Sequence, residues 1–191
     1  MTTTIILMVA IGAIGALYVL VTEVAAYRKW RGTRVITCPE THAPAAVVVD
    51  ARHAALYGAI NVSDLRLKQC SRWPERRECG QECLRQIELA PEDCLMRNIL
   101  ARWYEEKSCV FCGAPFGAIH TWDNKPAFVS ADGATLTLCS DVPGEKLPHV
   151  LETHRPVCWN CYVAEEFRRR NPELVVDWPA GVRPRHAGEH G

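Results

Sequence analysis

The chain has 191 residues, and its 22 Lys and Arg side chains balance its 22 Asp and Glu side chains, so its formal net charge is zero. A neutral chain lacks the basic excess with which proteins usually bind nucleic-acid phosphates. The length suits one ordinary domain or two small ones. Ten cysteines in such a chain predict that cross-links or metal ions supply part of the stability.

An uncharged apolar segment opens the chain. No side chain from Ile5 to Val21 carries a charge, and a helix of about 20 apolar residues spans the hydrocarbon core of a bilayer. A signal peptide is the alternative, but no Lys or Arg precedes the segment as a signal peptide would require. We therefore predict that residues 1–34 form a transmembrane anchor with a basic juxtamembrane segment.

Basic residues follow the apolar segment and none precede it. They are Arg28, Lys29, Arg31 and Arg34. By the positive-inside rule, the remainder of this single-pass protein is expected in the cytoplasm. Cytoplasmic thiols are kept reduced, so the cysteines are expected to bind metals or take part in redox chemistry rather than form structural disulfides. An exported, disulfide-rich domain is the alternative if the topology is inverted.

Residues 35–106 are predicted to form a small β unit followed by helices. Short strands are expected at 34–37, 45–51 and 64–70, with helical turns at 51–59. Cys38 and Cys70 each come at the C-terminal end of a strand. If those two strands run in the same direction, both thiols emerge at one edge of the sheet.

Two helices are expected after Gly80. The first places Cys83, Leu84 and Ile87 on one side. The second has Pro91 in its first turn, and its apolar residues recur at the spacing of a packed helix face. Those residues are Leu95, Ile99, Leu100 and Trp103.

Residues 107–177 contain two CxxC pairs, Cys109 with Cys112 and Cys158 with Cys161. Two such pairs are the usual ligand set of a closed, tetrahedral zinc site. A hairpin with Asp132 and Gly133 at its turn is predicted between them, and a charged helix follows the second pair. Residues 178–191 are rich in Pro, Gly and His and are predicted to be a disordered tail.

The order of knuckle, hairpin, second knuckle and helix resembles a treble-clef or zinc-ribbon module over residues 107–172. The resemblance implies a metal site and does not specify what the module binds. A long loop and the extra Cys139, expected as a buried apolar side chain, depart from a compact example. A thioredoxin-like dithiol is the alternative, but the βαβ framework of that fold is not visible in the pattern.

Five further cysteines compete for four places in a second metal site. We expect Cys38, Cys70, Cys79 and Cys83 as its ligands, with Cys94 as the substitute. Cys79 and Cys83 are four residues apart, which on a helix is one face. Zinc is expected, and an Fe–S cluster is the alternative, although the spacing matches neither common ferredoxin pattern. Inert buried thiols are the remaining interpretation.

The patterns that mark phosphate loops, nucleophile elbows and HExxH zinc sites are missing from the sequence, so no catalytic residue is nominated and an enzyme is not favoured. The sequence predicts an α+β protein with a membrane anchor and a cysteine-rich, metal-stabilised domain. Its expected function is to act as a binding or scaffold module for a membrane-associated protein partner. Nucleic acid is not expected as a partner, and no small-molecule substrate is identified. The alternative function is Fe–S electron transfer in a membrane complex.

Overall fold

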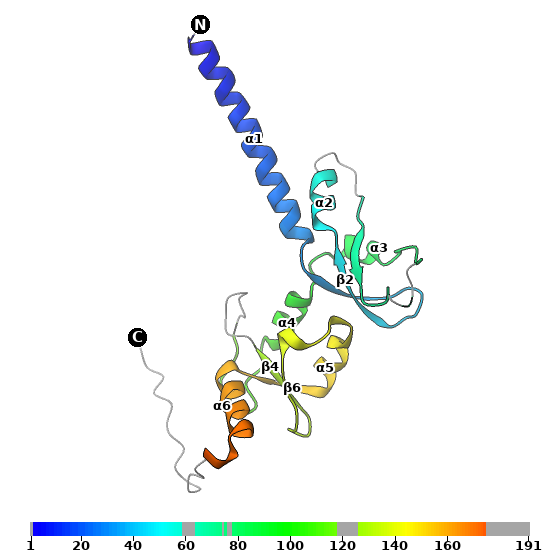
Figure 1. The fold of residues 1–191 in the computed structure, drawn as a ribbon, viewed down its shortest axis with the longest axis vertical. Coiled ribbons are helices and arrows are strands. Elements are labelled where there is room, and N and C mark those ends of the chain that lie inside the picture. Colours follow the sequence, from blue (N-terminus) through cyan, green and yellow to red (C-terminus); the bar gives the residue numbers. More distant parts are fainter. Residues whose placement is uncertain (1, 59–63, 74, 76–77, 118–125, 175–191) are drawn as a thin grey trace.

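The computed structural model describes residues 2–58, 64–73, 75, 78–117 and 126–174 (Figure 1). The predicted tail at 178–191 lies outside these residues. The described chain is a mixed helix and sheet protein. A long N-terminal helix is followed by two three-stranded antiparallel sheets, each accompanied by short helices.

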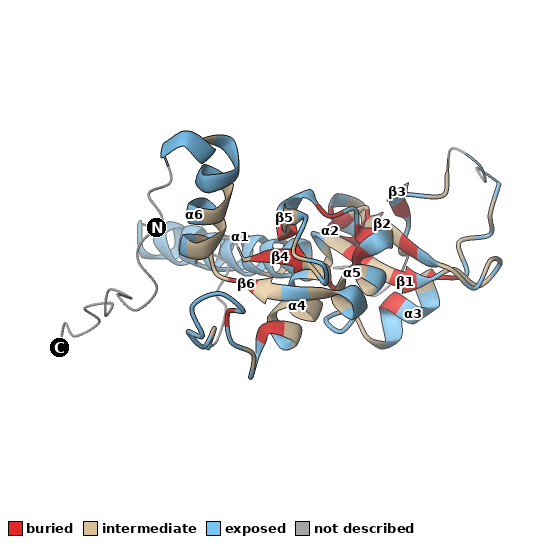
Figure 2. Cartoon of the chain, turned by 90° about the horizontal axis from the view of Figure 1, so that it is seen from below, coloured by how far each residue is buried: buried red, intermediate tan, exposed pale blue. Residues whose placement is uncertain are grey.

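The N-terminal helix α1 (Thr2–Trp30) has 29 residues, which at 1.5 Å per residue is about 43 Å. It is long and apolar enough to cross a membrane. Its side chains face outward along most of its length, and Figure 1 shows it projecting away from the rest of the chain. Figure 2 shows that α1 is exposed, whereas the buried residues gather in and around the two sheets.

The first sheet has the strand order β1 (Thr33–Thr37), β2 (Pro44–Val49), β3 (Leu67–Cys70). Both outer strands are antiparallel to β2 and therefore run in the same direction. Cys38 follows β1 and Cys70 ends β3, so the two cysteines lie at the ends of strands that run in the same direction, which is the condition that the sequence left open. Alternate residues of β2 are buried, and they pack with Ile87 of the short helix α3 (Leu84–Leu89).

Helix α2 (Ala51–Gly58) connects β2 to β3 and packs beside the C-terminal part of α1. Figure 1 shows α2 beside the end of α1, with the two helices running in opposite directions. Ala51, Ala54 and Ala55 are buried, and their small side chains allow close approach between helices. The sheet is therefore held to the end of the apolar helix by a second helix as well as by the chain itself.

Arg34 of β1 is fully buried and closes the end of α1. Its guanidinium donates to the carbonyl oxygens of Trp30 and Lys29, each at 2.7 Å. These carbonyls belong to the last turn of α1, which lacks partners within the helix and lies at the negative end of its dipole. Arg34 is thus a helix cap, and the exposed juxtamembrane charges are Arg28, Lys29 and Arg31.

The second sheet has the order β5 (Leu136–Leu138), β4 (Ala127–Ser130), β6 (His154–Val157), again antiparallel. The predicted hairpin forms β4 and β5, and Gly133 takes a positive φ of 74° at its turn. Helices α4 (Met96–Tyr104) and α5 (Leu147–Thr153) share a core with Phe128 of β4. The buried Tyr104 hydroxyl donates to the Ala127 carbonyl at 2.7 Å.

The two sheets are joined by a close contact at Gly144, which begins the 3₁₀ turn η2 (Gly144–Lys146). A Cβ atom added at Gly144 would lie 2.8 Å from the Cβ of Ala46 in β2. The backbone of the second unit therefore rests directly on the first sheet. The backbone N–H of Val35 also donates to the Cys94 carbonyl at 2.8 Å, just before α4.

Two local expectations are wrong. Cys79 and Cys83 do not share a helix face, because α3 begins at Leu84, with Cys83 as its N-cap and Gln81 in the left-handed region at φ 54°. Cys94 does not lie in the first turn of a helix. It lies in a turn before α4, which begins only at Met96.

Candidate metal centre

Cys109 and Cys112 lie in a tight turn that we call the knuckle turn (residues 109–114). The Cys109 N–H donates to the Ala114 carbonyl, and the Gly113 N–H donates to the Cys109 carbonyl, both at 2.8 Å. Gly113 has a φ of 73°, which glycine adopts without strain. This compact loop presents the two cysteine side chains from one short segment.

Cys158 and Cys161 lie where β6 gives way to helix α6 (Trp159–Arg170). Cys158 is the N-cap of α6, and Cys161 is in its first turn, as the sequence predicted. The positive end of the helix dipole favours thiolates at both places. The knuckle turn is attached here by hydrogen bonds from the Val110 N–H to the Pro156 carbonyl at 3.0 Å and from the Cys158 N–H to the Cys109 sulfur at 3.3 Å.

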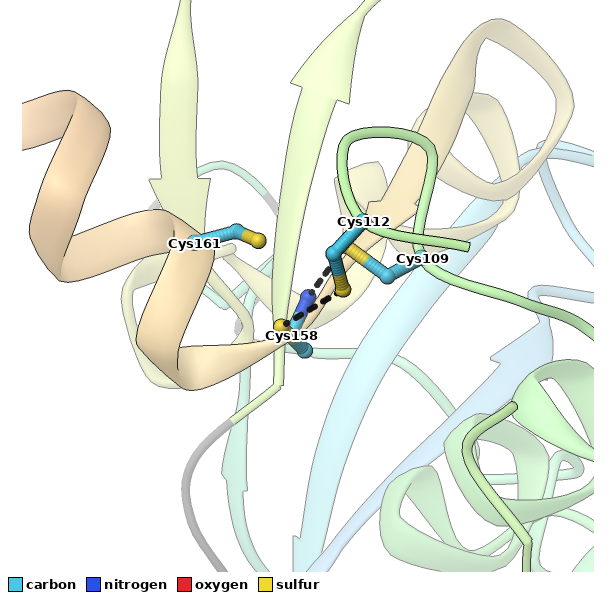
Figure 3. Close-up of side chains that lie close together, drawn as sticks. All are labelled: Cys109, Cys112, Cys158 and Cys161. Atoms are coloured by element: carbon cyan, nitrogen blue, oxygen red, sulfur yellow. Dashed lines mark hydrogen bonds between the residues drawn. The ribbon is translucent and has the colours of Figure 1, made fainter. Parts of the chain in front are cut away.

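The four sulfur atoms of Cys109, Cys112, Cys158 and Cys161 all lie within 4.8 Å of one another (Figure 3). The Cys112 and Cys158 sulfurs are 3.8 Å apart. Four sulfurs at about 2.3 Å from a central tetrahedral ion are separated by about 3.8 Å, so this spacing suits a single ion. We call these four residues the metal centre, since their arrangement can hold a metal ion.

The electrostatics of the metal centre favour one thiolate before the others. Burial acts to raise the pKa of Cys109, but the backbone N–H groups of Cys158, Cys112 and Phe111 outweigh it and lower that pKa to about 7. Burial and the other three thiols raise the pKa of Cys161. Proton loss from Cys109 is therefore easier than from Cys161, and any thiol that is still protonated is expected to lose its proton as a metal binds.

The other predicted ligands are less closely gathered. Within the described part of the chain, Cys38, Cys70, Cys79 and Cys83 do not form a group whose sulfurs are all within 4.8 Å. Three of them nevertheless belong to one apolar cluster, in which Cys83 is buried and Cys38 and Cys70 pack against it. We call these four residues the second cluster.

Cys94 packs against the same apolar cluster as Cys38 and Cys70 but has polar contacts of its own, and Cys139 lies in another core cluster. The Cys94 thiol donates to the Pro91 carbonyl at 3.6 Å, and burial raises its pKa, partly offset by the Arg34 charge. Cys139 is buried 3.4 Å from the Tyr104 hydroxyl, and burial raises its pKa to about 12. Cys139 is therefore a neutral, buried thiol, as the sequence predicted.

Comparisons of the chain with protein-family models, with curated proteins and with solved structures found no match. The metal centre itself is therefore the observation on which a functional interpretation depends. Its cysteines were recognisable from their spacing, whereas strand β6, which carries Cys158 into place, was not predicted. Pro156 made this strand difficult to recognise from the sequence, because proline is rare inside sheets. In the described part of the chain β6 pairs with β4 alone and lies at the edge of the sheet, where proline is tolerated.

Proposed function

We propose that this chain is a membrane-anchored, cytoplasm-facing protein whose metal-stabilised domain acts as a binding or scaffold module for a membrane-associated protein. The convergence of four cysteine sulfurs in the metal centre carries the proposal. A site closed by four thiolates has no open position for a substrate, so its role is structural rather than catalytic.

Zinc is the proposed ion. Thiolate ligands suit both zinc and iron–sulfur clusters. A cluster that contains inorganic sulfide would hold its cysteine sulfurs farther apart than a single ion does. The 3.8 Å separation between the Cys112 and Cys158 sulfurs supports a single ion. The knuckle turn, the hairpin and the cysteine-capped helix α6 support a treble-clef or zinc-ribbon-like module.

The contacts around α1 support a domain held close to the bilayer. About 20 residues of α1 are needed to cross the hydrocarbon core, so its last two turns would emerge among the lipid headgroups. Those turns are capped by Arg34 and lie beside α2. A helix fixed at its end in this way would set the orientation of the first sheet relative to the membrane.

Helix α6 offers the proposed surface for a protein partner. Val163 and Phe167 are one helical turn apart and are 46% and 53% exposed. The exposed side chains of Val110 and Phe111 belong to the knuckle turn, to which the start of α6 is attached. A metal ion in the centre would fix α6 against the knuckle turn, so the ion would control the shape of this surface.

Site-specific crosslinking in the membranes of the native cell tests the proposal. A photoreactive amino acid at Phe167 is expected to give a protein adduct of discrete mass, because the side chain would face the partner. The same amino acid at Leu89 of α3, which is 80% exposed, is the matched control and is expected to give none. Cys161→Ser should abolish the Phe167 adduct by releasing the ion. Absence of an adduct at Phe167, or the same adduct at both positions, would contradict a partner surface on α6.

A further inference from the structure

The turn at residues 38–43 has the backbone of the knuckle turn. The Cys38 N–H donates to the Ala43 carbonyl at 2.9 Å, and the His42 N–H donates to the Cys38 carbonyl at 2.8 Å. These bonds join the same relative positions as the two that close the knuckle turn. His42 also has a φ of 52°, where the knuckle turn has Gly113. A non-glycine residue in this left-handed region is uncommon, so the surrounding structure must hold the turn in place.

The same turn directs polar groups at the Cys38 sulfur. The Thr41 side chain and the backbone N–H groups of Thr41 and Glu40 outweigh burial and lower the pKa of Cys38. The backbone donors at the matching positions of the knuckle turn, Phe111 and Cys112, act on Cys109. Thr41 occupies the position of Cys112, and its hydroxyl is buried. The turn therefore repeats the backbone of the knuckle turn around Cys38, with threonine in the place of the second cysteine.

Helix α3 brings further thiols toward this turn. The Gln86 side chain donates to the Thr37 carbonyl at 2.8 Å, which places α3 beside the residue that precedes Cys38. Cys83 immediately precedes α3 with helical backbone, whereas Cys158 precedes α6 with extended backbone. Cys38 and Cys70 pack against the apolar cluster that contains the buried Cys83. The nearby thiol of Cys79 also acts on Cys83, whose pKa is raised to about 11, chiefly by burial.

We propose that Cys38, Cys70, Cys79 and Cys83 bind a second zinc ion, so that each of the two sheets has its own knuckle-bound metal. The four sulfurs are more widely spaced than in the metal centre, and the ion would draw them together around the buried Cys83. The thiolate is the form of cysteine that binds metal, so binding would release any protons that these side chains carry. Cys94 is not a ligand in this arrangement, because its thiol contacts Pro91 and Arg34. This site goes beyond the proposed function, which uses only the ion of the metal centre.

Zinc content of the full chain, purified in detergent micelles and measured by elemental mass spectrometry, tests the proposal. The wild-type chain is expected to bind about two zinc ions, and Cys79→Ser about one, because the partly exposed Cys79 supplies one ligand. Cys94→Ser is the matched control and should keep about two ions. Cys161→Ser should lose only the ion of the metal centre, so the failure of one site is distinguishable from the failure of the other.

A rescue experiment separates a ligand from a residue needed only for packing. Cys70→Ser is expected to retain about one zinc ion. Adding Thr41→Cys should restore about two, because position 41 matches the second cysteine of the knuckle turn. A packing defect at Cys70 would not be repaired by a thiol at position 41.

Three results would overturn the proposal. The first is a wild-type chain with one zinc ion that Cys79→Ser retains and Cys161→Ser loses. The second is loss of an ion from Cys94→Ser while Cys38→Ser keeps both. The third is iron with acid-labile sulfide that Cys79→Ser abolishes, since this would identify the second cluster as an iron–sulfur site.

Discussion

At the scale of single residues, Arg34 connects the end of the apolar helix α1 to the first sheet. Its sequence position suggested a juxtamembrane charge, but the structure buries it under the last turn of α1. Burial lowers its pKa, and the nearby Cys94 and Glu92 act in the opposite direction. A charged side chain is kept in this position because it satisfies carbonyl groups that the helix leaves unpaired.

Replacing Arg34 should weaken this junction. Arg34→Met removes two charge-assisted hydrogen bonds to carbonyl groups and should lower the free energy of unfolding by about 2–3 kcal/mol. Arg31→Met is the matched control, because Arg31 is exposed at the same junction. Denaturant unfolding of the full chain in micelles measures the difference. Equal losses in the two variants would show that Arg34 is not the cap described here.

Cys109 gives the metal centre a pH dependence that can be measured. Its pKa is lowered to about 7 in the metal-free fold, so it is mostly protonated at pH 6 and mostly a thiolate at pH 8. Cys109 should therefore contribute about one displaced proton when zinc binds at pH 6 and almost none at pH 8, so binding releases more protons at the lower pH. Lower pH adds a proton to be displaced and weakens binding.

Calorimetric titration with zinc in buffers of different ionisation enthalpy counts these protons. The Cys79→Ser variant is the suitable protein, because it isolates the metal centre from the second cluster. A proton count that does not change between the two pH values would contradict the lowered pKa of Cys109.

At the scale of elements, the position of helix α2 is set by its packing against the apolar helix α1. Leu56 and Tyr57 are exposed near its C-terminal end, the end that runs back along α1 (Figure 1). If α1 spans a bilayer, this end of α2 lies at the headgroup level, where aromatic and apolar side chains are favoured. The charged groups Asp64 and Arg66 pair with each other just before β3.

A fluorescent probe can test this position of α2. A polarity-sensitive label at Leu56→Cys should show a blue-shifted emission in liposomes, because the label would contact lipid. The same label at Leu89→Cys, on the exposed side of α3, should show the emission of an aqueous site. The unsubstituted chain, labelled for the same brief time, measures the background from the native cysteines. Identical emission at the two positions would place α2 away from the bilayer.

The sequence predicted elements well where the signal was local. The first three strands, α2, the hairpin at Gly133 and Cys161 in a helical turn were all recognisable from alternation, turn residues or spacing. Helix α3 was expected to begin soon after Gly80 but begins at Leu84. The left-handed backbone of Gln81 interrupts the helical pattern before Cys83, and no proline in the sequence marks that interruption. Strand β6 depends on pairing with β4, which is distant in sequence. Arg34 bonds nearby carbonyl groups, but its burial depends on how the chain turns back after α1, which no local pattern reveals.

The candidate site also has one part that the sequence predicted and one part that only the fold shows. The spacing of Cys109, Cys112, Cys158 and Cys161 was sufficient to predict one centre, because CxxC turns constrain their own geometry. The turn at Cys38 was not recognisable as a knuckle, since Thr41 replaces the second cysteine and His42 replaces the glycine. Its likeness to the knuckle turn lies in the backbone hydrogen bonds and emerges only from the fold.

At the scale of the whole molecule, the charges that flank α1 predict its direction in the membrane. Arg28, Lys29 and Arg31 remain exposed on the C-terminal side, so the domain is expected in the cytoplasm. A reporter that is active only in the cytoplasm should work when fused after Gly191. Activity only from a reporter that requires the exported side would reverse the topology and favour disulfides over metals.

The central claim is that four cysteine sulfurs of the metal centre hold one zinc ion. X-ray absorption spectroscopy at the zinc edge, performed on the purified Cys79→Ser chain, tests it most directly because that variant isolates the centre. The predicted result is one zinc ion with a shell of four sulfur atoms at about 2.3 Å. A folded chain without metal, or a zinc ion bound mainly by nitrogen or oxygen, would contradict the claim.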